Sequence, residues 1–151
     1  MYTRAFRDRR QRGLRGPLLP PTLPRYRSRG QLFDAAVLEA YSPLAAQFPE
    51  QLANLDVAVD TVPRMQLRPD LTVLPPEIVA DGPVPLGRII PAGVDAAGNP
   101  TRSRIVIFRM PIEHRVERPE ELHELLATIL TALVAGYLNV DPRDIDPDFQ
   151  W

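Results

Sequence analysis

The stretch that decides the fold runs through residues 120–139 and reads EELHELLATILTALVAGYLN. Its apolar residues recur at the three- and four-residue intervals of one helical face. They are Leu122, Leu125, Leu126, Ile129, Leu130, Leu133, Tyr137 and Leu138. Pro119 suits the first position of a helix, and Glu120 and Glu121 follow where the helix dipole favours acidic groups. The sequence therefore predicts a helix of about five turns, whose uncharged second half we expect to be buried nearly all round.

Two strands are expected before this helix, at residues 84–90 and 104–108. The turn-forming residues between them are Asp95, Gly98, Asn99 and Pro100. We therefore expect a β-hairpin over residues 86–108 with a long connection. Residues 56–62, which are rich in valine, form a further strand candidate.

Two other stretches are expected to be irregular. Residues 63–85 hold six prolines, which exclude a regular helix or a central strand, so we expect a loop or an insertion there. Residues 110–115 are expected to form a loop that carries Glu113, His114 and Arg115.

A first helix is expected from about Gln31. Its apolar residues are Phe33, Val37, Ala40, Tyr41 and Leu44. Ser42 and Pro43 interrupt this pattern, because proline lacks a backbone donor and restricts the residue before it. The sequence predicts either a kink or a restart capped by Ser42. Near the other end of the chain, we expect Asp141 to cap a short turn that opens at Pro142.

Charge divides the chain into two parts. It has 151 residues, no cysteine and 18 basic residues, all of them arginine. Without cysteine, disulfides and cysteine-ligated zinc sites are excluded. Residues 1–29 hold nine arginines against one aspartate, a balance of +8, whereas residues 30–151 carry −9. Residues 1–29 also have too few regularly spaced apolar residues to offset the entropy of ordering, so we expect a disordered basic leader before one domain over residues 30–151.

The leader has two interpretations. It is either an anion-seeking arm for nucleic acid or acidic lipid, or a solvated tail that binds nothing specifically. Few aromatic residues are available to stack on bases, which favours the interpretation as a solvated tail. No apolar run approaches the roughly 18–20 residues of a membrane span, and the N-terminus lacks the apolar region of a secretory signal. We therefore predict no membrane association and a cytoplasmic location.

Several short segments carry a family resemblance. They read RGLRGP at residues 12–17, PLGR at residues 85–88 and RIVIFRMPI at residues 104–112. Over roughly residues 11–148, the chain resembles the actinobacterial branch of the minimal zincin-like metallopeptidases. The resemblance implies an α+β fold in which a small, mostly antiparallel sheet packs against two main helices.

The resemblance also implies where zinc chemistry would lie. In zinc-bearing relatives, the last helix carries HExxHxxGxxD, whose two histidines and aspartate hold zinc while the glutamate deprotonates the metal-bound water. In the matching register this chain has Ala132, Leu133 and Gly136 for the first histidine, the glutamate and the second histidine. Asn139 and Pro142 stand for the glycine and the aspartate. The motif is degenerate in this register, so we predict a pseudoenzyme with no catalytic residue and no cofactor.

Two other groups of residues resemble a metal site in residue type or spacing. His123 and Glu124 reproduce the first half of an HExxH motif in the wrong register, and with His114 and Glu113 they could form a weak two-histidine site. A solvated helical face explains the same residues better. The aspartates near the C-terminus have the spacing of a calcium loop but lack its glycine and its terminal glutamate; they are Asp141, Asp144, Asp146 and Asp148.

These observations leave three functional hypotheses. The leading one is a non-catalytic binding or scaffolding module, whose groove between the edge strand and the motif helix accepts a peptide or protein segment by strand addition. The first alternative is a zinc-dependent peptidase with non-standard ligands from His114, His123 and the C-terminal aspartates; zinc is expected only in this case. The second alternative is a nucleic-acid-associated protein that acts through residues 1–29.

Overall fold

The computed structural model describes residues 28–63 and 77–151. Contacts divide the chain between residues 35 and 36. Nearly all of the predicted leader lies outside the described residues, as do the RGLRGP segment and residues 64–76 of the proline-rich stretch. The predicted boundary between leader and domain, at residues 29 and 30, therefore stays a prediction.

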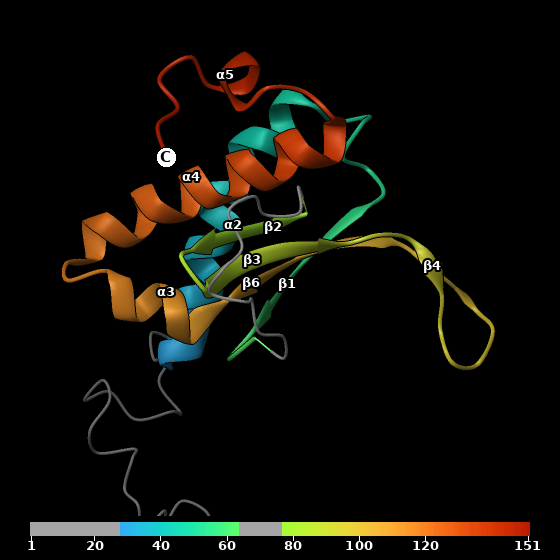
Figure 1. Ribbon diagram of the computed structural model, residues 1–151, viewed down its shortest axis with the longest axis horizontal. Helices are drawn as coiled ribbons and strands as arrows, with labels where there is room; N and C mark the ends of the chain where they lie inside the picture. The colour runs from blue at the N-terminus through green and yellow to red at the C-terminus, as the bar shows by residue number, and fades with distance from the viewer. Residues whose placement is uncertain (1–27, 64–76) are drawn as a thin grey trace, which may run out of the picture. The chain divides into compact units, whose positions relative to one another are not determined.

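A four-stranded mixed sheet forms the centre of residues 36–151 (Figure 1). Its strands lie in the order β1-β6-β3-β2, with the first pair parallel and the other two antiparallel. Their bounds are β1 Leu55–Asp60, β2 Ile78–Asp81, β3 Val84–Ile90 and β6 Ser103–Phe108. Two of the three pairings are antiparallel, so the predicted mostly antiparallel sheet is confirmed.

The predicted hairpin is confirmed as the antiparallel pair of β3 and β6. Its connection contains a two-stranded ribbon of β4 (Gly93–Val94) and β5 (Pro100–Thr101). The ribbon turns as its composition predicts: Asp95 Oδ1 accepts hydrogen bonds from the amides of Ala97 (3.0 Å) and Asn99 (2.9 Å).

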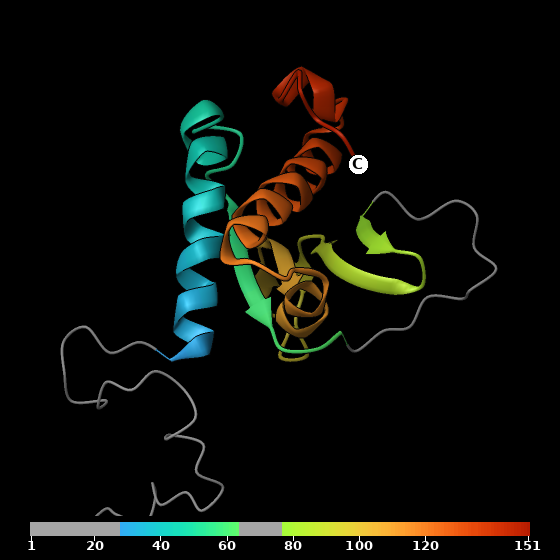
Figure 2. The same ribbon diagram turned by 90° about the vertical axis from the view of Figure 1, so that its left-hand side faces the viewer.

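Four helices accompany the sheet among the described residues: α2 Arg29–Gln47, α3 Arg109–Arg115, α4 Pro119–Leu138 and α5 Pro142–Ile145. Figures 1 and 2 both show α4 lying over the sheet, and it contacts β2 and β3. The predicted α+β class, with α2 and α4 as the two long helices, is confirmed. The bounds of α4 agree with the predicted helix, including its start at Pro119.

The core of residues 36–151 lies between α4 and the sheet. Five α4 side chains have no exposed area: Leu126, Ile129, Leu130, Leu133 and Val134. Their counterparts Leu86, Ile105 and Ile107 in β3 and β6 are equally buried. Each such side chain stabilises the fold by about 1.5–3 kcal/mol relative to an exposed position.

Gly87 sets how closely α4 approaches β3. A Cβ atom at this position would lie 3.0 Å from Leu133 Cδ1 and 3.2 Å from the carbonyl oxygen of Val106. The first atom belongs to a side chain that can move, but the second is backbone of the neighbouring strand. Glycine is therefore the residue that lets the helix and both strands pack this closely.

The prediction of a second helix capped by Ser42 is wrong. α2 is continuous and contains Pro43, while the Ser42 hydroxyl donates a hydrogen bond to the carbonyl oxygen of Leu38 at 2.8 Å. Ala40 and Leu44, on either side of Pro43, are both buried. This burial offsets the backbone hydrogen bond that proline removes, so tertiary packing holds one helix.

The prediction of a loop over residues 110–115 is also wrong, because this stretch belongs to helix α3. Pro111 occupies the first turn, where backbone amides have no partner within the helix, so proline costs little there. The Met110 amide instead donates to the carbonyl oxygen of Thr61 at 2.9 Å. Arg109 and Glu113 pair one turn apart at 3.2 Å, and Ile112 is fully buried.

Strand β2 was not predicted. It lies within the proline-rich stretch, and it is an edge strand, the one position in a sheet that the neighbouring prolines permit. The first strand was predicted at residues 56–62; the observed strand, Leu55–Asp60, starts one residue earlier and ends two residues earlier.

Helix α4 also bears on the expected absence of a membrane span. By length and composition alone, this 20-residue helix could cross a membrane, a test that the core helix of a soluble protein passes as well. Its buried residues face the sheet, as a core helix requires. The cytoplasmic location stays a prediction.

Candidate functional site

The C-terminal end of α4 has a residue in the left-handed backbone conformation. Asn139 has φ 58° and ψ 48°, the left-handed conformation that glycine adopts most easily and asparagine next. The Val140 amide donates to the Ala135 carbonyl oxygen at 3.0 Å, and the Asn139 amide donates to that of Gly136 at 3.3 Å. Asn139 thus makes a glycine-like turn at the position assigned to the glycine of the motif.

The other motif positions present no metal ligand. Ala132 is half-buried and Gly136 is exposed, and neither side chain has a donor atom. Pro142 begins α5, where the Asp141 carboxylate accepts a hydrogen bond from the Arg143 amide at 2.8 Å, so the predicted cap at Asp141 is confirmed. The residues at this site do not fit a zinc ion, because zinc is bound by side-chain nitrogen, oxygen or sulfur atoms and none is present at these positions.

Leu133, which the predicted register aligns with the glutamate of the motif, is a core residue. It has no exposed area and packs against Gly87. A carboxylate here would be removed from water with no charged partner provided, an environment that disfavours its ionised form. The position is therefore used for packing between α4 and β3.

Neither histidine of the chain belongs to a group of three or more candidate metal ligands within the described residues. His114 lies in the last turn of α3 and His123 lies in the second turn of α4, and both side chains are exposed. Across residues 28–63 and 77–151, no group of three histidine, aspartate or glutamate side chains could hold a metal ion. The set of His114, His123 and the C-terminal aspartates therefore has no support in the geometry.

Two cavities lie at opposite ends of β2, and both border α4. The first, of about 250 Å³, is here called the Gly136 cavity; it is lined by Glu77, Ile89, Pro91, Ser103, Gly136 and Tyr137. The second, of about 440 Å³, is called the Trp151 cavity; it is lined by Asp81, Arg115, Glu124, Leu125, Thr128, Gln150 and Trp151. Glu77 immediately precedes β2 and Asp81 is its last residue, so the strand spans the distance between the cavities.

The outer edge of β2 offers backbone hydrogen-bonding groups. The Ile89 amide donates to the Glu77 carbonyl oxygen at 2.8 Å, which makes these residues a hydrogen-bonded pair of the antiparallel ladder. Ile78 and Arg88, the next pair, are then non-hydrogen-bonded partners. The amide and carbonyl of Ile78 consequently point away from β3, and no further strand of the described ranges pairs with β2.

A buried phenol lies close to the Gly136 cavity. Burial raises the pKa of Tyr41 above 10.0, and the neighbouring Tyr137 and Asp56 add to the shift. The Tyr41 hydroxyl is buried and has no hydrogen-bond partner among the described residues. Tyr137 lines the cavity, so the uncharged Tyr41 phenol lies next to one of the lining residues.

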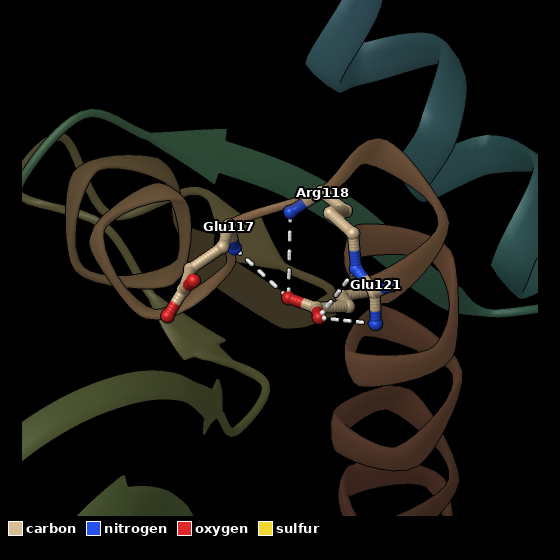
Figure 3. A network of polar contacts seen from close by, with 3 residues as sticks. All are labelled: Glu117, Arg118 and Glu121. Carbon is tan, nitrogen blue, oxygen red and sulfur yellow. Dashed lines mark hydrogen bonds and ion pairs between the residues drawn. The ribbon is translucent and has the colours of Figure 1, made fainter.

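A polar network fixes the other end of α4 (Figure 3). The Glu121 carboxylate accepts hydrogen bonds from the amides of Glu117 (2.9 Å) and Arg118 (3.4 Å) and from Arg118 Nε (3.1 Å). The Glu117 amide, followed by the Arg118 side chain, lowers the pKa of Glu121 below 4.5. The acidic first turn predicted from the dipole thus acts mainly by capping local backbone and side-chain donors.

Apart from Gly136 and Glu124, sequence reasoning named no cavity residue as part of a site. Glu77, Ser103 and Tyr137 belong to no motif, and they approach one another only because β2, β6 and α4 meet there. The alternation of apolar residues could have identified Ser103 as the start of a strand, but not as part of a cavity. The predicted groove between an edge strand and the last helix stays a prediction; β2 is an edge strand that contacts α4.

Residues 52–151 match the family model of the zincin-like metallopeptidases. This match covers about two-thirds of the chain and confirms the resemblance drawn from the sequence; the actinobacterial branch and the motif register stay predictions. No curated protein matches the chain.

Proposed function

Because this chain belongs to the zincin-like metallopeptidase family, we propose that it keeps the scaffold of that family without its zinc chemistry and binds extended peptide segments. In this proposal the chain is a non-catalytic binding or scaffolding module. A segment adds to β2 as a further antiparallel strand, alongside α4. Backbone hydrogen bonds supply affinity and the cavities receive side chains.

The observation that carries the proposal is the outer edge of β2, with which no other strand of residues 28–63 and 77–151 pairs, between the two cavities. The outward amide and carbonyl of Ile78 are the backbone groups that a bound strand needs. The cavities lie at either end of the same strand, next to Glu77 and Asp81. A site of this form requires no metal, because peptide recognition by strand addition uses only backbone groups and pockets.

The composition of the chain argues against catalysis of the family type. It holds two histidines and no cysteine in all 151 residues. Both histidines lie away from Ala132 and Gly136, where two ligands would be needed on one helical face. The glutamate position is filled by buried Leu133, so a general base is missing as well.

The decisive experiment compares two substitutions at one backbone position. The full chain is screened against an array of extended peptides, and the best binder is titrated by fluorescence anisotropy. Ile78→Pro removes the outward amide without touching the ladder to β3, so we expect the affinity to fall at least tenfold. Ile78→Val keeps the amide and is expected to bind as the original chain does. Equal binding by all three proteins would refute strand addition to β2.

Metal analysis separates this proposal from the first alternative. After dialysis against trace zinc, we expect background zinc and no peptidase activity. Near one zinc per chain, with activity lost on chelation, would overturn the proposal and direct attention to His114 and His123. Salt-sensitive binding of nucleic acid that disappears on deletion of residues 1–29 would instead support the second alternative.

A further inference from the structure

The geometry points to a sequence preference at this site: we infer that the bound segment carries two basic side chains four residues apart. The inference rests on the proposed function, because it names the class of segment that the edge of β2 receives. It follows from the charge of the cavities, their walls and the spacing set by β2.

Each cavity has a net charge of one negative. In the Gly136 cavity the charged lining residue is Glu77. In the Trp151 cavity Asp81 forms an ion pair with Arg115, and Glu124 supplies a further carboxylate. One arginine against two acids leaves the second cavity as negative as the first. A segment with a cation in each cavity is therefore matched in charge.

The walls of the cavities suit long basic side chains. Ile89 and Pro91 face the Gly136 cavity together with Glu77, and Leu125 faces the Trp151 cavity together with Glu124. Arginine and lysine place their aliphatic stems along apolar surface while the charged head reaches a polar group. Volumes of about 250 and 440 Å³ leave room for such side chains.

The spacing follows from the regular repeat of β2. Glu77 and Asp81 are four residues apart, which corresponds to about 13 Å along a strand. Two residues of β3, Leu86 and Gly87, lie opposite one residue of β2 at the register shift, so the extra residue of the irregularity belongs to β3. An added antiparallel strand opposite β2 then presents residues i and i+4 on one face, toward the two cavities.

The electrostatic field of the acidic domain also favours a basic segment. Residues 30–151 carry a balance of −9. Such a field increases the rate at which a basic segment reaches the edge of β2, and salt weakens this effect.

The test uses four fluorescent twelve-residue peptides with the same uncharged background and the full chain. The first carries arginine at positions 4 and 8, the second at positions 4 and 7, the third has glutamine at 4 and 8, and the fourth has glutamate there. We expect the first peptide to bind most tightly by fluorescence anisotropy, by about two- to fivefold for each arginine that finds its carboxylate. Its advantage is expected to shrink as sodium chloride is raised from 50 to 500 mM.

Charge-neutral variants of the protein locate the contacts. Glu77→Gln and Glu124→Gln are each expected to reduce the advantage of the first peptide over the third. Glu50→Gln, at an exposed position after α2, is the matched control and leaves that advantage unchanged. Circular dichroism spectra that coincide with that of the original chain establish that each variant is folded.

The outcomes separate this inference from the proposed function. Equal binding of the first and third peptides, both lost in Ile78→Pro, would overturn the inference and leave strand addition intact. Equal binding of the first and second peptides would overturn the four-residue spacing. Failure of all four peptides, and of every peptide on the array, would overturn the proposed function itself.

Discussion

The two sides of the second half of α4 are fixed by different constraints. On the side facing the sheet, Leu133 is wholly buried against Gly87, and neither residue can change size without moving its neighbour. On the side of the Gly136 cavity, Ala132 and Gly136 end in a methyl group and a hydrogen atom, and Gly136 is exposed. The fold therefore depends on the shape of the first side, while small changes of side chain on the second side leave the core undisturbed.

Truncation of an α4 side chain that faces the sheet should have the largest effect on stability. Leu133→Ala removes a fully buried side chain and leaves a cavity, so we expect the free energy of unfolding to fall by about 2–5 kcal/mol. Urea unfolding followed by circular dichroism measures the loss. Ala132→Ser, the neighbouring change on the other side, is expected to cost less than about 1 kcal/mol. Similar losses in both variants would contradict the comparison.

Overpacking of the contact between Gly87 and Leu133 should have the next largest effect on stability. Gly87→Ala places a methyl group against Leu133 Cδ1 and the carbonyl oxygen of Val106, and we expect it to cost about 1–3 kcal/mol. Combined with Leu133→Ala, the new methyl group gains space, so the double variant should lose less stability than the sum of the single losses. Strict additivity in the same urea experiment would mean that the two residues do not share this contact.

A smaller effect is expected where α4 ends. Asn139→Ala puts a side chain with no local hydrogen-bonding atom into the left-handed conformation, at a cost of about 1 kcal/mol. Asn139→Gly is expected to be neutral or slightly stabilising, because glycine adopts this conformation without strain. Thermal unfolding of the two variants ranks them directly. A loss in Asn139→Gly equal to that in Asn139→Ala would show that the amide side chain, not the backbone conformation, matters here.

The smallest effect is expected at the start of α4, where the Glu121 carboxylate is exposed to solvent. Its pKa is lowered in the folded state by the Glu117 amide and Arg118, so its contribution to stability is present above the ordinary pKa of 4.5 and is lost as the pH falls through the lowered value. Glu121→Gln should therefore reduce the melting temperature slightly at pH 7 and not at all at pH 2. Salt should diminish the difference. A gap that persists at pH 2 would rule out the charge as its source.

Much of the fold could be predicted because its signals are local. Helix α4 has a proline at its start, an uninterrupted apolar period and a left-handed residue at its end, so its bounds were readable from the sequence. Helix α3 was missed because seven residues with a proline show no period, and its stability comes from Ile112 in the core and from contact with Thr61. The continuity of α2 across Pro43 likewise depends on burial, which no local pattern reports.

The residue types available to the candidate site could be counted from the sequence, but the arrangement of these residues could not be predicted. A count of two histidines and no cysteine limits zinc ligation without any structure. The cavities, however, join residues as distant as Glu77 and Tyr137, or Asp81 and Trp151. Their proximity is a product of strand order and helix placement, and neither is encoded in a short motif.

The parallel pairing of β1 with β6 has a consequence for how the chain folds during synthesis. Leu55 pairs with Ser103 and Asp60 with Phe108, so β1 leaves the ribosome well before its neighbour exists. The β3–β6 hairpin can close as soon as residue 108 emerges, because its strands are near each other in the chain. β1 then joins a preformed edge, and α4 covers the sheet last. Early termination before residue 119 would leave the apolar face of the sheet exposed, so incomplete chains of this protein should be strongly prone to aggregation.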